Sequence, residues 1–185
     1  MLNRPECKRV ALGQTDAATL CRLFDGLFLS RFHTCLRGGG GEPLYKPAVE
    51  NEPAVITFRS DYVSSALHEV AHWCLAGPTR RRHQDYGYWY CGDRNADVQR
   101  RFEAVEARPQ ALEWMFSLAM GIRFVPSRDN FEVPSSPFFN RQILDELKAF
   151  VDTGLPRRAD IFATHLSNGE DYCRLASLEL SRADS

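Results

Sequence analysis

The pattern of apolar and polar residues along the chain predicts mainly helical structure. Apolar residues recur every three or four positions over about residues 15–35, 61–76, 96–120 and 141–151. Thr15 or Asp16 can cap the first helix, and Pro109 interrupts the third. The apolar face of the first helix consists of Leu20, Leu23, Phe24, Leu27, Phe28 and Phe32.

The segments between these helices predict turns and loops, with only a short strand. Residues 54–58 have β character and predict a short strand. The glycines of residues 38–41 indicate a break in regular structure, and Gly77-Pro78 ends the second helix. Prolines at 126, 134 and 137 make residues 123–139 a predicted loop. The expected fold is mainly α with a few short strands (α+β).

Length, charge and cysteines narrow the class of protein. The 185 residues suit a single domain, 1–185. A net charge of −1 gives no overall field that would favour nucleic acid or a membrane as partner. No signal peptide or membrane span is apparent, so we expect a cytoplasmic protein. The six cysteines include no C-x-x-C pair, which argues against a zinc ribbon or a disulfide framework.

The candidate chemistry lies in the second helix, in His68-Glu69-Val70-Ala71-His72. Residues four apart on a helix share one face, with Cβ atoms about 5–6 Å apart. Both imidazoles can therefore reach one metal ion at about 2.0–2.1 Å. The alternative is a pair of histidines at the edge of the core that are four apart by coincidence.

A third ligand is expected in the third helix. If its buried stripe consists of Phe102, Val105, Pro109, Leu112, Phe116 and Ala119, Glu106 lies at the edge of that stripe. Glu103 then lies towards the opposite face and is the reserve candidate. A solvated glutamate is the commoner fate of such a residue, and a kink at Pro109 would rotate Glu106.

Two histidines and one carboxylate leave coordination positions open. This set suits catalytic zinc and the iron(II) sites of oxygenases, and spacing alone does not choose between them. A zinc metallopeptidase would use Glu69 as its general base. A binding module with a structural metal explains the pattern less well, because structural zinc sites are closed and usually contain thiolates.

The segment after the second helix is basic and then aromatic. Arg80, Arg81 and Arg82 form a local basic patch, whose alternative reading is a solvated helix end. An aromatic group follows, which consists of Tyr86, Tyr88, Trp89 and Tyr90. The arginines and this aromatic group together suggest a pocket for a cationic or amphipathic chain of an acidic macromolecule. Asp129 and Asn130 are further candidates for the pocket wall.

These residues together resemble the bacterial elongation factor P hydroxylases. The resemblance is carried by S65-A-L-H-E-V-A-H-W-C-L-A-G77, R81-R, D85-Y-G-Y-W-Y90, F102-E-A-V-E-A-R-P-Q-A-L-E-W-M-F116 and S127-R-D-N130. It is strong over about residues 42–130, the expected metal-binding core, and thinner towards both ends.

The resemblance implies an enzyme that uses iron(II) and O2 to hydroxylate a lysine side chain of elongation factor P. The lysine has first been extended by β-lysylation, and hydroxylation is the last step. His68, His72 and Glu106 match the positions expected to hold the metal, which could be zinc in purified protein. The implied scaffold is zincin-like, and 2-oxoglutarate is not implied.

Overall fold

The computed structural model describes residues 16–84, 96–126 and 137–183. Within these ranges the chain forms six α-helices, one 3₁₀ helix and a three-stranded sheet. The helices are α1 (Ala17–Phe32), α2 (Val63–Leu75), α3 (Ala96–Met120), α4 (Pro137–Thr153), α5 (Arg157–Leu166) and α6 (Tyr172–Ala183), and the 3₁₀ helix is η1 (Arg80–Arg82). The prediction of a mainly helical fold with a few short strands is confirmed.

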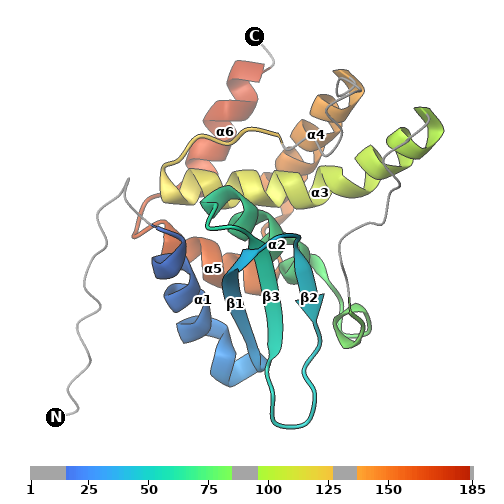
Figure 1. Cartoon of the computed structure of the whole chain (residues 1–185). Helices are drawn as coiled ribbons and strands as arrows, with labels where there is room; N and C mark the ends of the chain where they lie inside the picture. The colour runs from blue at the N-terminus through green and yellow to red at the C-terminus, as the bar shows by residue number, and fades with distance from the viewer. Residues whose placement is uncertain (1–15, 85–95, 127–136, 184–185) are drawn as a thin grey trace, which may run out of the picture.

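The long helix α3 runs through the middle of the molecule. In Figure 1, α4 and α6 lie on one side of it, and α2, α5 and the sheet lie on the other; all four helices contact α3. The middle of α3 is buried, with Ala111, Leu112, Met115 and Phe116 inaccessible to solvent. Pro109 lies within the helix and does not end it, so the predicted interruption is wrong.

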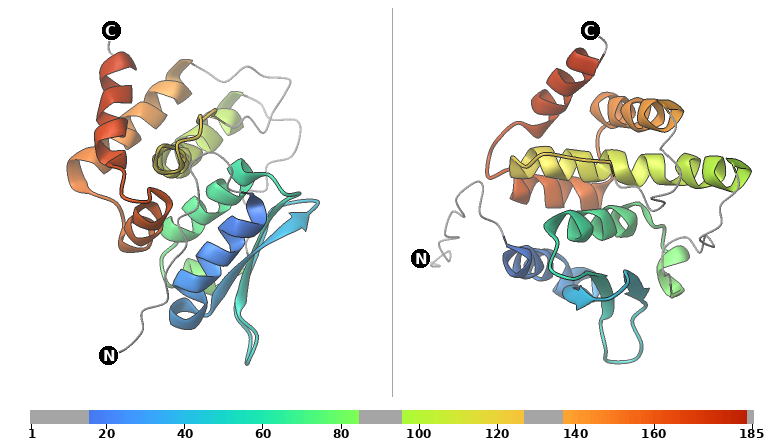
Figure 2. Two further views of the ribbon diagram at one scale, coloured as in Figure 1. Left: turned by 90° about the vertical axis from the view of Figure 1, so that its left-hand side faces the viewer. Right: turned by 45° about the horizontal axis from the view of Figure 1, so that its top comes forward.

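The sheet supports the start of α2. It consists of β1 (Thr34–Gly40), β2 (Leu44–Lys46) and β3 (Ala54–Arg59), in the order β1-β3-β2. β1 runs parallel to β3, and β2 runs antiparallel to it. Ala54, Ile56 and Phe58 alternate inwards along β3, and α1 and α2 lie on the same face of the sheet (Figure 2).

The first predicted helix was too long at its C-terminal end. Asp16 caps α1, since its Oδ1 accepts a hydrogen bond from the Thr19 amide at 2.7 Å, and this prediction is confirmed. The helix ends at Phe32 because His33 adopts the left-handed conformation, with φ 48°. The chain then enters β1, in which Cys35 is a buried strand residue.

Gly38, Gly39 and Gly40 belong to strand β1, so the predicted break in regular structure begins only at Gly41. A Cβ atom at Gly38 would lie 2.7 Å from Asp61 Oδ1, and one at Gly40 would lie 2.7 Å from Thr57 Cγ2. Glycine therefore permits a close approach between β1 and its neighbours. The predicted loop 123–139 was also too long, because α4 begins at Pro137, where proline is favoured in a first turn.

None of the helices in the described ranges combines the length and apolar character needed to cross a membrane.

Candidate metal centre

Helix α2 presents both histidines on the face that meets α3. Ala66, Leu67 and Val70 are fully buried and fix the rotation of the helix in the core. His68 and His72 are half-buried, with 18% and 17% of their side chains exposed, so a small molecule can reach them. The helix ends before Gly77-Pro78, as predicted.

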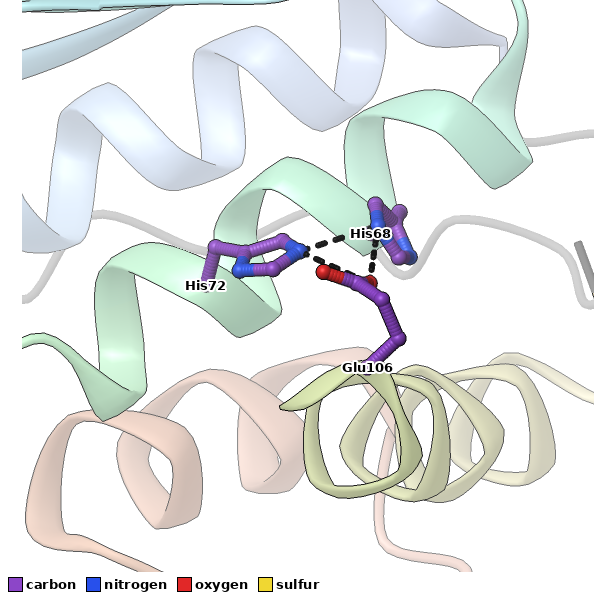
Figure 3. Close-up of side chains that lie close together, drawn as sticks. All are labelled: His68, His72 and Glu106. Atoms are coloured by element: carbon purple, nitrogen blue, oxygen red, sulfur yellow. Dashed lines mark hydrogen bonds and ion pairs between the residues drawn. The ribbon is translucent and has the colours of Figure 1, made fainter. Parts of the chain in front are cut away.

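Three of the predicted residues meet at one point. The Nε2 atoms of His68 and His72 lie 3.0 Å apart. Oε2 of Glu106, from α3, lies 3.4 Å from the first and 3.3 Å from the second. Figure 3 shows the two rings and the carboxylate converging from the two helices. Potential ligand atoms of these three residues all lie within 4.8 Å of one another.

This triangle fits a metal ion of the first transition series. Ligand atoms bound at about 2.1 Å are separated by roughly 3.0 Å at right angles and by roughly 3.4 Å at the tetrahedral angle. The three observed separations span the same range. Two imidazoles and one carboxylate are the donor set that suits zinc or iron(II) and leaves positions open for exogenous ligands. The residues present therefore fit such an ion.

The face of α3 that carries Glu106 is polar and yet buried. Its members are Glu103, Glu106, Gln110, Glu113 and Ser117, each no more than 4% exposed. The prediction that Glu103 faces away from the core is wrong, because it is 1% exposed, and Val105, expected in the buried stripe, is 37% exposed. The buried face of α3 includes polar side chains, so the apolar stripe alone does not locate it.

Glu113 is a further buried carboxylate at the candidate site, and the apolar pattern of the sequence does not mark it. Its Oε2 lies 2.9 Å from Nδ1 of His68, on the opposite side of the ring from Glu106. A carboxylate in this place orients the imidazole and keeps Nε2 available as a ligand. The available signal was the spacing: Glu113 lies seven residues after Glu106, which is two turns along the same helical face.

The electrostatics of the metal-free protein reflect this close packing. Burial by itself would raise the pKa of Glu106, but hydrogen bonds from His68 and His72 outweigh it and hold that pKa below the usual range. Burial by itself would lower the pKa of His68, but the carboxylates of Glu106 and Glu113 raise it well above 6.5. The site thus favours a cation, whether a proton or a metal ion.

The other predicted residues fall into two groups. Glu69 is half-buried and lines a small pocket with His72, Arg80 and Arg81. Arg80 and Arg82 are exposed on η1, whereas Arg81 is half-buried against Trp73. The remaining candidates lie outside the described residues; they are Tyr86, Tyr88, Trp89, Tyr90, Asp129 and Asn130.

Fold and site together define a helical protein with an open two-histidine, one-carboxylate centre. Comparison with known proteins gives the family. The family model for elongation factor P hydroxylase matches residues 23–178. The chain is 39% identical over 166 residues to an elongation factor P lysine hydroxylase from Haemophilus influenzae, covering 86% of this chain and 93% of that protein. This chain belongs to the elongation factor P hydroxylase family.

Proposed function

We propose that this protein is a metal-dependent hydroxylase that acts on the β-lysylated lysine side chain of elongation factor P. The observation that carries the proposal is the His68–His72–Glu106 triangle, which lies within the segment matched by the family. An iron(II) ion held by this triangle would supply O2 activation at its open positions. We expect the enzyme to act in the cytoplasm, where its substrate works in translation.

The roles of the chain's own side chains follow from their contacts. His68 and His72 would bind the ion through their Nε2 atoms, and Glu106 would supply the negative charge that partly balances a divalent cation. Oε2 of Glu113 accepts a hydrogen bond from Nδ1–H of His68 and thereby holds the ring in place. Because α2 and α3 are both anchored in the core, the ligands need little rearrangement on binding.

The direct test is hydroxylation in vitro. Purified protein, iron(II) and a reductant are incubated in air with β-lysylated elongation factor P, and the modified peptide is analysed by mass spectrometry. We expect a gain of one oxygen atom on the modified lysine, and no gain with His72→Ala. If the β-lysylated lysine gains no oxygen after incubation with fully iron-loaded wild-type protein, the proposal is contradicted.

A zinc metallopeptidase is the second candidate, because Glu69 lies beside His72 at the same pocket. A peptidase requires this carboxylate as a base, and removing such a base typically costs about 10²–10⁴ in rate. We expect Glu69→Gln to retain metal and measurable hydroxylation, and the wild type to cleave no peptide. Peptide cleavage that disappears in Glu69→Gln would favour the peptidase.

A further inference from the structure

A small pocket lies beside the metal centre, between α2 and the sheet. Carbon-rich side chains form much of its lining: Tyr45 of β2, Ile56 of β3, and Trp73 and Ala76 at the end of α2. His72 belongs both to this lining and to the metal triangle. A molecule in the pocket therefore lies next to a candidate metal ligand.

The polar atoms of the two aromatic residues do not make this lining polar. Nε1 of Trp73 is a buried atom with almost no accessible surface, so the indole presents carbon atoms to the open space. The hydroxyl of Tyr45 donates a hydrogen bond to the backbone carbonyl of Arg81 at 2.9 Å and is thereby occupied. Ile56 and Ala76 have aliphatic side chains. Most of the surface that these four residues offer is therefore carbon.

Charged side chains also line the pocket, but they do not call for a polar ligand. Glu69 and Arg80 both interact with other groups of the protein, and Arg80 is exposed to solvent on η1. Nη1 of Arg81 is a buried atom and does not face the open space. A water molecule inside a protein needs about two to four polar partners, and the carbon lining does not supply them.

The size of the pocket limits its occupant to a small molecule. About 40 Å³ of it is open to water-sized molecules. A single water molecule needs roughly 10–15 Å³ of such space, so the pocket has room for a molecule of two or three atoms. It is too small for a whole extended lysine side chain. An apolar molecule of the right size gains free energy by leaving water for such a surface.

We propose that this pocket holds dioxygen beside His72 before the gas reaches the metal. This inference rests on the proposed function, in which O2 is the co-substrate. Dioxygen is diatomic, uncharged and a poor hydrogen-bond partner, so it matches both the size and the carbon lining of the pocket. A raised local concentration of O2 next to His72 would lower the KM for O2 without altering how the three ligands hold the ion.

Xenon binding to the metal-free protein tests the pocket without reference to catalysis. Xenon is an unreactive gas that occupies dry apolar cavities. We expect the methyl signals of Ile56 to shift saturably under xenon pressure in NMR spectra of the wild type. Ala76→Leu should abolish this shift by filling the pocket, and the extended backbone of Ala76 (φ −63°, ψ 123°) accommodates leucine. Ala18→Leu, exposed on α1, is the matched control and should bind xenon as the wild type does.

A second variant covers the case in which Ala76→Leu is poorly folded. Ala76→Val fills less of the pocket, and we expect it to weaken xenon binding by a smaller factor. The absence of a saturable shift at Ile56 in the wild type would overturn the proposal. Equal xenon affinity in the wild type and in a folded Ala76 variant would also overturn it, because the gas would then bind elsewhere.

Oxygen kinetics connect the pocket to turnover. Hydroxylation of β-lysylated elongation factor P is followed by mass spectrometry at graded O2 concentrations. We expect Ala76→Leu to raise the KM for O2 about fivefold, with metal content and with kcat at saturating O2 close to those of the wild type. An unchanged KM for O2 in a variant that no longer binds xenon would overturn the proposal.

The two measurements separate failure of the pocket from failure of the proposed function. If the iron-loaded wild type hydroxylates nothing, the proposed function is overturned and the assignment of O2 with it. The xenon titration would still show whether the pocket takes an apolar gas. If the wild type hydroxylates its substrate but does not bind xenon, the proposed function stands and the dioxygen pocket does not.

Discussion

Two buried glutamates of α3, one turn apart, make the assignment of the third ligand testable at the level of single residues. Glu106 points at both histidines, whereas Glu103 accepts a hydrogen bond from Gln99 within its own helix. We expect Glu106→Gln to lose stoichiometric metal and Glu103→Gln to keep it, as measured by metal analysis of protein reconstituted anaerobically. Metal retained by Glu106→Gln and lost by Glu103→Gln would transfer the role to Glu103.

Glu113 gives a second prediction at this scale. Glu113→Gln retains an acceptor for His68 Nδ1 but removes the negative charge, and we expect metal affinity to fall about 10–100-fold. Glu103→Gln, a buried glutamate of the same helix, serves as the control. An unchanged dissociation constant in a metal competition assay would show that the 2.9 Å contact does not support the ligand.

The pH dependence of metal binding follows from the same contact. Because the pKa of His68 is raised above 6.5 in the metal-free protein, a proton competes with the metal below that pKa. Apparent affinity should therefore rise with pH and level off above the pKa of His68. Loss of the Glu113 charge lowers this pKa, so Glu113→Gln should reach its plateau at a lower pH. A profile that does not move would contradict this account.

At the level of elements, Arg158 of α5 connects two helices far apart in sequence. Its Nη2 donates to the carbonyl oxygens of Trp73, Cys74 and Ala76 at 2.8, 3.0 and 2.6 Å. Its guanidinium also lies 4.7 Å from the centre of the Trp73 ring. Trp73, Cys74 and the C-cap Ala76 stand at the C-terminal end of α2, where backbone carbonyls generally lack donors within the helix. The arginine therefore caps the helix that carries His68 and His72.

Removal of this cap should destabilise the protein more than it affects the site. We expect Arg158→Ala to lower the free energy of unfolding by about 2–4 kcal/mol, from the lost charged hydrogen bonds and ring contact. The melting temperature should fall by about 5–15 °C, while the folded variant still binds one metal ion. Arg157→Ala, an exposed neighbour, is the control. Equal melting temperatures for the two variants would exclude a capping role.

Much of the element pattern was accessible from the sequence because local signals were strong. Asp16 at the start of α1 and Gly77-Pro78 after α2 marked real boundaries. The strand β1 was not accessible from the sequence, because its three glycines are typical of a loop. Close contacts with Asp61 and Thr57 explain Gly38 and Gly40. Those contacts exist only once the chain has folded.

The candidate site likewise combines features that local sequence predicts with features that depend on tertiary packing. The pair His68 and His72 depends on helical geometry alone, so the sequence was sufficient to bring them together. The face of α3 could not be derived in this way, because Glu103, Glu106 and Glu113 are buried by packing against other helices. A polar stripe buried by tertiary contacts does not appear in a search for apolar periodicity.

On the scale of the whole molecule, the distribution of charge suggests where a protein substrate docks. The chain is nearly neutral, with a net charge of −1, so a local cluster can steer a partner. Arg80 and Arg82 are exposed on η1, next to the pocket at the metal centre. Arg81 faces Trp73 instead, so the basic patch available to a macromolecule is smaller than the sequence indicated.

The double variant Arg80→Glu/Arg82→Glu tests this docking surface. We expect it to weaken binding of acidic, β-lysylated elongation factor P about tenfold, mainly through a slower association rate, because charges at the rim of an interface act on encounter. Its binding should also depend less on salt than that of wild type, since the screened attraction has been removed. Metal content should stay the same, because both arginines lie on η1, whereas the candidate ligands lie on α2 and α3.

A matched reversal elsewhere separates local docking from net charge. Arg174→Glu/Arg182→Glu introduces the same change in charge on α6, which lies on the other side of α3 from the metal helix (Figure 1). If the patch on η1 guides docking, surface plasmon resonance will show a slower association rate for the η1 variant than for the α6 variant. Equal losses in the two variants would mean that overall charge governs the encounter. No loss in either would leave Arg80 and Arg82 as a solvated helix end.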